Sequence, residues 1–441
     1  MTETVTVIRP TGTVTVAGGP ATSVGGPREL LDGDRIRAFV ARSLAGAGVD
    51  GRSVCVLVPD ATRSGPLPLL LGAIHAALHG RVARLSVLVA LGTHAAMDGP
   101  SLAAHLGSPP GALDETYPDT VIAQHRWWDP TAFAALGTIG SDRVAELSGG
   151  LLTDAIPVRV NRAVVDHDVV LIVGPVFPHE VVGFSGGNKY LFPGVSGREL
   201  IDVSHWLGAL LTSSALIGTT GTTPVRALID EAAAMVPAER LAFCTVTGTD
   251  PGTVRSVAFG DPVAAWASAA EVSAEAHVRH LDAPVAQVLS LVPERYDDLW
   301  TGAKGFYKVE PVVADGGQVV LYAPHIRELS LTHPRIAEIG YHCRDYFLGQ
   351  WDRFAGVPWG DLAHSTHLRG SGTWDPVAGE RVRVTVTLAT GIPEEVTRSV
   401  GLDYLDPTSV DPVAWGDRAG TLVVPDAGED LYRLRRTPDP G

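Results

Sequence analysis

The stretch Gly174-Pro-Val-Phe-Pro-His-Glu-Val-Val-Gly-Phe-Ser-Gly-Gly-Asn-Lys-Tyr-Leu-Phe-Pro-Gly194 decides how this chain is expected to fold. It follows Asp168-Val-Val-Leu-Ile-Val173, a continuous apolar run that is typical of a strand buried in a parallel sheet. Such a strand delivers His179 to its carboxyl end, where open α/β sheets bind their ligands. The glycine-rich loop that follows carries one lysine, Lys189, and glycines let backbone N–H groups approach a phosphate closely. The chemistry of the protein is therefore expected around this loop.

Two further apolar runs also end in polar residues. The run 52–59 ends at Asp60-Ala-Thr-Arg63, and the run 85–91 ends at Gly92-Thr-His94. Helical patterns, such as the one over 66–79, lie between the runs. This alternation predicts an α/β fold with a doubly wound parallel sheet, and it predicts that the strand ends meet at one edge.

The length of 441 residues predicts two α/β domains. A long helix over 261–277, followed by Asp282-Ala-Pro, indicates a boundary. The larger N-terminal cofactor-binding unit is expected to span 1–280 and to be joined by 391–441. A smaller C-terminal unit, 285–390, is expected to close over the active site between them. Further strands are expected at 1–9 (an edge strand), 241–246, 286–292, 317–324, 381–389 and 420–425, and residues 426–441 are expected to fray.

The composition excludes several classes of partner. The net charge of −15 argues against nucleic acid and against an anionic membrane surface. No apolar run approaches the roughly 18 residues of a membrane span, and the first residues lack the pattern of a signal peptide. Cys55, Cys244 and Cys343 are far apart and form no CxxC motif, as expected for a reducing compartment. These features predict a cytoplasmic enzyme.

Lysine is rare in this chain. Of 34 basic residues, only Lys189, Lys304 and Lys308 are lysines. A lysine offers a neutral amine for covalent chemistry, which arginine does not. Chance retention on a solvated surface is the alternative, and the glycine-flanked settings favour a function for Lys189 and Lys304 more than for Lys308.

Each local motif leaves an alternative open. The loop before Lys189 fits neither GxxxxGK[ST] nor GxGxxG, so a tight structural turn explains it equally well. His94 and His179 are either a pair of acid/base groups or buried hydrogen-bonding residues. In one interpretation, Asp60 simply caps the following helix and pairs with Arg63; in the functional alternative, Arg63 holds a nucleotide phosphate or a substrate carboxylate. We interpret as structural the remaining candidates, namely the pairs His75/His79, His277/His280 and His364/His367, the single residues His125 and His167, and Trp127-Trp128.

Taken together, the motifs resemble a known family. Asp60-Ala-Thr-Arg63, Gly92-Thr-His94, Pro178-His179, Gly183-Phe-Ser-Gly-Gly-Asn-Lys189, Pro193-Gly194, Ser204-His205 and Gly302-Ala-Lys304 resemble the lactate racemase family in order and spacing, across most of residues 50–325. That family uses a nickel-pincer nucleotide, nickel pyridinium-3,5-bisthiocarboxylate mononucleotide. The resemblance implies a racemase or epimerase that inverts C2 of a 2-hydroxy acid by hydride transfer to and from this cofactor.

The resemblance also implies a role for each matching residue. Lys189 would join the cofactor through a thioamide, and His205 would be the protein ligand to nickel. His94 and His179 would be the catalytic histidines. The nucleotide would be held by Asp60, Thr62, Arg63, Ser185, Gly186 and Gly187, and the substrate by Arg63, Thr301 and Lys304.

The substrate is expected to be bulkier than lactate. Thr301 stands where lactate racemase itself has a glutamine, which leaves space that Trp300 and Tyr307 are expected to shape. A sugar acid, an aryl hydroxy acid and a dicarboxylic hydroxy acid all remain open, and cofactor-synthesis enzymes would be needed for loading. Two rival hypotheses are a phosphate-loop nucleotide-dependent transferase and a non-catalytic protein that binds the cofactor or a hydroxy acid.

Overall fold

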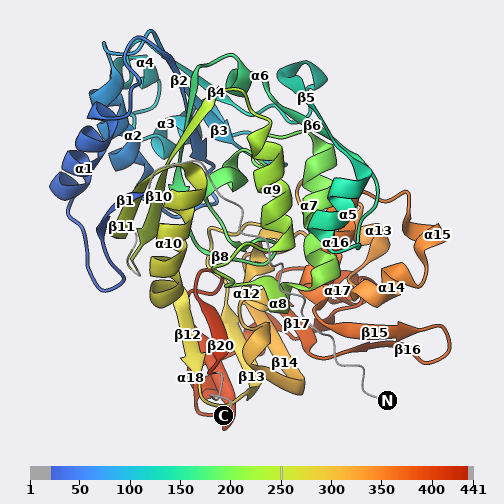
Figure 1. The fold of residues 1–441 in the computed structure, drawn as a ribbon. Coiled ribbons are helices and arrows are strands. Elements are labelled where there is room, and N and C mark those ends of the chain that lie inside the picture. The colour runs from blue at the N-terminus through green and yellow to red at the C-terminus, as the bar shows by residue number, and fades with distance from the viewer. Residues whose placement is uncertain (1–20, 249, 251, 436–441) are drawn as a thin grey trace, which may run out of the picture.

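The computed structural model describes residues 21–248, 250 and 252–435, and the strand expected over 1–9 lies outside them. The described chain forms two α/β units, with residues up to about 280 in the upper part of Figure 1 and the following residues in the lower part. The predicted fold class, two α/β units with a larger N-terminal parallel sheet, is confirmed. Within the described ranges, no helix has both the length and the apolar character needed to cross a membrane.

The N-terminal unit is built on a seven-stranded sheet in the order β1-β11-β10-β7-β2-β3-β4. The strands from β10 to β4 run parallel, while β1 and β11 pair antiparallel at one edge. The chain winds outward from β2 to one side and from β7 to the other, so the topological switch point lies between β2 and β7. The strands are β1 (Thr22–Gly25), β2 (Ser53–Pro59), β3 (Arg84–Ala90), β4 (Thr120–Gln124), β7 (Val169–Pro175), β10 (Glu239–Thr247) and β11 (Val254–Gly260).

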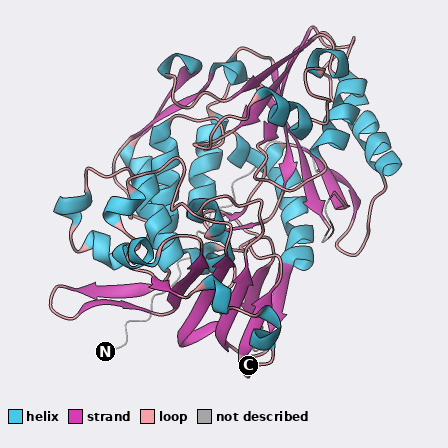
Figure 2. Cartoon of the chain, turned by 180° about the vertical axis from the view of Figure 1, so that it is seen from behind, coloured by secondary structure: helices cyan, strands magenta, loops and turns pink. Residues whose placement is uncertain are grey.

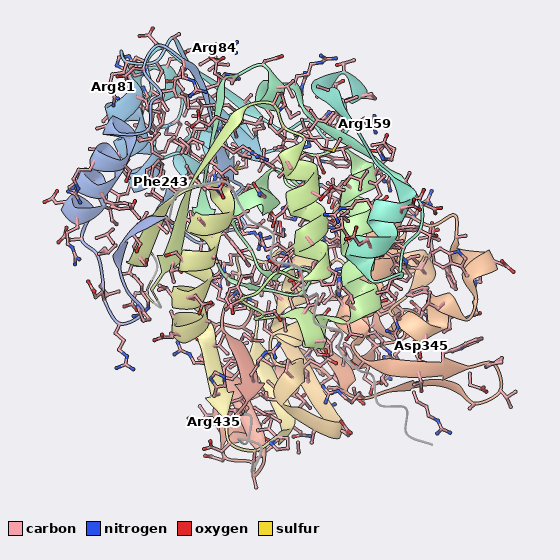
Figure 3. All side chains as sticks on the ribbon, in the orientation of Figure 1. Arg81, Arg84, Arg159, Phe243, Asp345 and Arg435 are labelled. Carbon is pink, nitrogen blue, oxygen red and sulfur yellow. The ribbon has the colours of Figure 1, made fainter. Side chains whose placement is uncertain are left out.

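Helices cover both faces of this sheet. In β2, Val54 and Val56 belong to the core under α1 (Gly33–Ala45) and α2 (Leu67–Leu78), whereas Cys55 and Leu57 belong to the core on the opposite face. That second core is covered by α5 (Ser141–Ser148), α7 (Arg198–Leu211), α9 (Pro224–Ala234) and α10 (Pro262–His277). Burial on both faces explains why the strands read as continuous apolar runs. Figure 3 shows Phe243 inside this unit and Arg81 and Arg84 at its outer edge.

The C-terminal unit is built on a five-stranded parallel sheet in the order β18-β17-β14-β13-β19. One of its cores contains residues of the short helices beside the first unit, and its other core contains Trp415. Figure 2 shows this sheet from behind, below the helices. The elements are β13 (Val285–Leu291), β14 (Val313–Ala323), β17 (Thr385–Thr390), β18 (Asp403–Tyr404), β19 (Thr421–Val424), α11 (Leu299–Gly302), α12 (Lys304–Tyr307), α16 (Trp359–Arg369), α17 (Glu394–Ser399) and α18 (Pro412–Gly416).

Short elements complete the chain. β15 (Gly372–Asp375) and β16 (Gly379–Val382) form an antiparallel hairpin that projects from the body in Figures 1 and 2. The loop of interest contains β8 (Pro178–His179), β9 (Gly183–Phe184) and the 3₁₀ helix η2 (Gly187–Tyr190). The others are α3 (Gly99–His105), α4 (Leu113–Thr116), β5 (Phe133–Ile139), β6 (Ile156–Asn161), α6 (Arg162–Val165), α8 (Ser213–Leu216), α13 (Ile336–Ile339), α14 (Arg344–Leu348) and α15 (Trp351–Phe354).

The end of the chain differs from expectation. Residues 391–441 were expected to rejoin the N-terminal unit, but β18 and β19 extend the C-terminal sheet. An open parallel sheet has an unpaired strand at each edge. Here β18 pairs with β17 at one edge, and β19 pairs with β13 at the other. The expectation of fraying over 426–441 is wrong for β20 (Leu431–Leu434), which pairs with β12 (Val278–Leu281) at the junction of the two units. The strand expected over 381–389 is divided between β16 and β17.

Candidate active site

A cavity of about 350 Å³ lies where the carboxyl ends of β2, β3 and β7 meet the C-terminal unit. Its wall takes Asp60, His94, His179, Lys189 and His205 from the N-terminal unit. The C-terminal unit contributes other wall residues, among them Trp300, Thr301, Lys304 and Tyr307. The strand ends that the sequence singled out therefore meet at one place, because the carboxyl ends of neighbouring parallel strands share an edge of the sheet.

His94 is held by Asp60. Its Nδ1 lies 2.5 Å from Oδ2 of Asp60, which is buried at the end of β2. Oδ1 of Asp60 accepts from the backbone and the hydroxyl of Thr62, at 3.1 and 2.7 Å. Burial alone would raise the pKa of Asp60, but the charge and hydrogen bond of His94 and the charge of Arg63 hold that pKa well below its usual range. Since an ionised carboxylate only accepts, Nδ1 of His94 carries a proton, and in the neutral ring the lone pair is then on Nε2.

His179 is set up in the complementary way. The backbone N–H of Val181 donates to its Nδ1 at 3.2 Å, which assigns the proton of the neutral ring to Nε2. Burial and the nearby Lys189 lower the pKa of His179 well below 6.5. A carboxylate oxygen of Glu180 lies 3.3 Å from the same Nδ1, so a second proton there would form an ion pair. The two imidazoles therefore differ in their hydrogen bonds, since Nδ1 donates in His94 and accepts in His179.

The backbone of the glycine loop before Lys189 is fixed by hydrogen bonds from two buried side chains, Arg226 and Trp266. The buried Arg226 donates to the carbonyls of Phe184 and Gly186, at 2.5 and 3.5 Å, and its guanidinium lies 3.8 Å from the Trp266 ring. The Trp266 Nε1–H donates to the Ser185 carbonyl at 3.0 Å. Three consecutive loop carbonyls thus point away from the cavity.

The amine of Lys189 is prepared for chemistry as a neutral group. Burial and the nearby Arg63 lower the pKa of Lys189 to about 7. A substantial fraction of this side chain is therefore unprotonated at neutral pH, which is the form that attacks an electrophile. An ordinary surface lysine, with a pKa near 10.4, would be almost fully protonated.

His205 lies in α7 and exposes one ring nitrogen. Its Nδ1 donates to the Ile201 carbonyl at 2.7 Å, so the other nitrogen, Nε2, keeps its lone pair. This is how protein structures orient a histidine that binds a metal. Burial and Lys189 lower the pKa of His205 to about 4, which keeps the lone pair available.

Two basic residues besides Lys189, namely Lys304 and Arg63, also line the cavity. Burial and Arg63 lower the pKa of Lys304 to about 7, and its Nζ lies 4.5 Å from the Tyr296 ring centroid. Arg63, at the end of β2, lines the same space. Thr301 also lies in the wall, but its hydroxyl donates at 2.7 Å to Oδ1 of Asp298, the residue that caps α11.

Of the other residues expected at the cofactor, Ser185 and Gly186 line the cavity, whereas Thr62 and Gly187 are not part of its wall. The hydroxyl of Thr62 is bonded to Asp60, and that of Ser185 donates to the Pro175 carbonyl at 3.2 Å. Gly186 lines the cavity, whereas Gly187 packs against α10, where a Cβ would meet Trp266 at 2.9 Å. Lys308 donates to the Glu429 carbonyl at 2.6 Å and lines a small adjoining cavity.

The pair His364/His367, interpreted from its spacing as surface or packing residues, lies at the cavity and not at the surface. Both residues are buried on α16 and line the cavity. The rings of His333, Trp300 and His364 stack in that order. Helix α16 packs against α7 of the N-terminal unit, a contact that the spacing of residues 364 and 367 alone does not indicate.

Trp127 and Glu180 were also missed. Trp127 lines the cavity, and its Nε1–H donates to the His94 carbonyl at 3.0 Å. Glu180 was passed over although it adjoins His179. The other histidines interpreted as structural lie outside the cavity wall; for example, His125 bonds Asn161 and His167 bonds Ser86.

The cavity fits a cofactor that takes one amine and one imidazole from the protein. Lys189 supplies the amine and Nε2 of His205 supplies the imidazole nitrogen, both at the same wall. Among residues 21–248, 250 and 252–435, no group of three or more His, Cys, Asp or Glu side chains could hold a metal ion by itself. A nickel ion whose remaining ligands belong to an organic cofactor needs no such group.

The buried histidines predict a steep acid dependence of stability. Burial lowers the pKa of His125, His205, His333 and His367 to about 4. Below pH 6.5 the unfolded chain takes up protons at these positions that the folded chain does not. Stability is therefore fully present above pH 6.5 and is lost progressively down to about pH 4. Urea denaturation of the cofactor-free protein at a series of pH values measures it, and an unfolding free energy that is constant from pH 7 to 5 would contradict this assignment.

Comparisons with known proteins agree on one family. Residues 40–218 match the lactate racemase N-terminal domain. The lactate racemase of Thermoanaerobacterium thermosaccharolyticum is 24% identical over 178 residues, which are 40% of this chain and 37% of that protein. A crystal structure of a Thermotoga maritima protein matches with a TM-score of 0.84 and 31% identity, over 93% of this chain and 100% of the other. The lactate racemase apoprotein of T. thermosaccharolyticum has the same fold, with a TM-score of 0.67 and 18% identity over 90% of this chain and 93% of the other.

Proposed function

This chain belongs to the lactate racemase family, and from that premise we propose that it is a racemase or epimerase of a 2-hydroxy acid that uses a nickel-pincer nucleotide. One observation carries the proposal, namely that Lys189, His205, His94 and His179 line a single cavity. These residues lie far apart in the chain and come from different elements.

The residues that would hold the cofactor are Lys189, as the covalent attachment point, and His205, as the protein ligand to nickel. The glycine loop and Arg63 lie beside them for the phosphate of the nucleotide. When bound, this cofactor supplies an acceptor for the hydride carried on C2 of the substrate. Enzymes that synthesise the cofactor would have to load it, and we propose that this takes place in the cytoplasm.

The protein's own residues would position the substrate and move its hydroxyl proton. Lys304 and Arg63 are placed to bind the C1 carboxylate. In the neutral form of His94, Asp60 would hold the proton on Nδ1, and Nε2 would then accept the hydroxyl proton. To return a proton to the hydroxyl oxygen after C2 inverts, His179 would have to act as the imidazolium, with its second proton on Nδ1 beside Glu180, and it would be left neutral. His94 would end the cycle as the imidazolium, and proton exchange with solvent would reset both rings. Inversion at one carbon requires a group of this kind for each face, and the opposite hydrogen-bonding of the two rings supplies them.

A size argument supports a substrate larger than lactate. Thr301 is short and its hydroxyl is turned to Asp298, so this side chain leaves room in the cavity, which Trp300 and Tyr307 also line.

The proposal is tested on full-length protein co-produced with the cofactor-synthesis enzymes. We expect an intact mass that exceeds the chain mass by one covalently attached nucleotide, about one nickel per chain, and interconversion of the C2 configurations of a 2-hydroxy acid by chiral chromatography. A nucleotide that leaves on denaturation would instead support a transferase, and an adduct without turnover on any acid would support a binding protein.

A further inference from the structure

His94, the proposed proton acceptor, lies in a loop and not in a helix or a strand. Residues 91–98 join β3 to α3, and His94 is in the middle of this segment. Its side chain is 30% exposed, whereas that of its partner Asp60 is 8% exposed. A reacting group has to be held within about 0.5 Å of its productive position, and loops are less precise supports than helices or strands. His94 therefore needs support from outside its own loop.

Residues at the end of β4 and just after it hold this loop at two points. The indole Nε1–H of Trp127 donates to the carbonyl of His94 at 3.0 Å. Gln124, the last residue of β4, bonds both backbone groups of Met97: its Oε1 accepts from the N–H at 2.9 Å, and its Nε2 donates to the carbonyl at 2.8 Å. These bonds are all made to the backbone of the loop, so they fix its path.

Trp127 is itself fixed. The turn that carries it is closed by Asp129, whose N–H donates to the Arg126 carbonyl at 3.0 Å and whose Oδ2 lies 3.1 Å from Nη1 of Arg126. The Trp127 ring lines the cavity and packs against the core under α1 and α2, as Met97 does. The ring of Trp128 lies edge-on to it, with the centroids 5.7 Å apart, but is 52% exposed and is not part of the cavity wall. The two adjacent tryptophans therefore have different surroundings.

We propose that Trp127 is a positioning residue for His94, because its N–H fixes the backbone from which the His94 ring reaches into the cavity. The inference rests on the proposed function, since it concerns the group that would accept the hydroxyl proton. Asp60 determines which ring nitrogen carries the proton, and Trp127 determines where the ring lies. An indole N–H donates and has no acceptor role, so phenylalanine at this position cannot replace the bond to the carbonyl.

The first test uses full-length protein without cofactor, with the heavy nitrogen isotope in its histidines. At a fixed pH, long-range proton–nitrogen NMR correlations report the chemical shifts of both ring nitrogens of His94, and His94→Gln identifies these signals by removing them. Trp127→Phe keeps a ring in the wall and removes the N–H. We expect both nitrogen shifts to move towards those of free histidine, because a displaced loop releases the ring from Asp60. Trp128→Phe, the same replacement at the exposed neighbour, should leave them unchanged.

The second test uses protein co-produced with the cofactor-synthesis enzymes, and whichever of lactate, gluconate, phenyllactate and malate the wild type turns over. Trp127→Phe should lower kcat about 10- to 100-fold, the cost of misplacing a reacting group by roughly an ångström, while KM changes less than about threefold. Trp128→Phe should change neither constant. In a His94→Gln background, Trp127→Phe should cost little more, because both substitutions disable the same group and their effects are not additive. A merely structural role would lower kcat by the same factor in both backgrounds.

Wild-type nitrogen shifts in Trp127→Phe would overturn the inference, and so would a wild-type kcat or an equal loss of kcat in Trp128→Phe. Far-ultraviolet circular dichroism verifies that the variants fold. A wild-type protein that turns over none of the four acids would count against the proposed function, and the nitrogen shifts would then still decide whether Trp127 fixes His94. Failure of the inference and failure of the proposed function are therefore distinguishable.

Discussion

Lys189→Arg is expected to abolish covalent attachment of the cofactor. Because burial lowers the pKa of Lys189 to about 7, its amine is available in the neutral form, whereas a guanidinium stays protonated. The wild-type chain should carry the mass of one attached nucleotide after denaturation, and the variant should show the chain mass alone. Turnover should fall by about 10⁴-fold or more, the scale observed when a covalent catalytic group is removed.

Lys308→Arg is the matched control for attachment. Lys308 is also buried beside the site and has a pKa lowered by burial to about 8, but its Nζ donates to the Glu429 carbonyl. We therefore expect this variant to keep the adduct. If Lys189→Arg still carried the adduct, the cofactor would be attached at another residue. If both variants lost the adduct, the loss would not identify Lys189 as the attachment point. Far-ultraviolet circular dichroism verifies that both variants fold.

Asp60→Asn is expected to lower kcat by about 10² to 10⁴-fold while the adduct remains, the range expected when a histidine loses the carboxylate that sets its tautomer. In the wild-type protein, Oδ2 of Asp60 fixes the proton of His94 on Nδ1. The asparagine amide can donate to Nδ1, which moves the proton to Nε2 and removes the lone pair that accepts the hydroxyl proton. Steady-state kinetics on the acid that the wild type turns over should show the loss in kcat, with KM changed only a few fold.

Thr62→Val is the control for that experiment. It removes a donor to the other carboxylate oxygen, Oδ1 of Asp60, and leaves the bond to His94 in place. Its kcat should stay within about tenfold of the wild type, because the substitution removes only one hydrogen bond to the Asp60 carboxylate. An Asp60→Asn protein with wild-type kcat would contradict the assignment of His94 as proton acceptor, and so would an equal loss in Thr62→Val.

The strand ends could be predicted from the sequence because the signal is local. β2, β3 and β7 read as apolar runs since both faces of the sheet are buried, and each run is followed within a few residues by Asp60, His94 or His179. The carboxyl ends of neighbouring parallel strands share an edge, so the fold class alone brings these side chains together. The single lysine of the glycine loop was found in the same way.

The far wall of the cavity could not be predicted in this way. His364 and His367 share a helical face whose spacing is as typical of a surface as of a buried site. Trp300, His333 and His364 stack only because α11, the segment before α13, and α16 pack on one side of the C-terminal sheet. The reassignment of 391–424 has the same origin, since β18 and β19 find partners far from them in the chain.

The amino-acid sequence by itself determined the parallel sheet of the N-terminal unit and the acid/base, amine and imidazole residues at its edge, because periodicity and strand ends are properties of neighbouring residues. Tertiary structure decided which aromatic rings of the C-terminal unit line the cavity, how Asp60 orients His94, and where the last strands belong. Those features depend on contacts between segments far apart in the chain, and such contacts exist only once both units have packed.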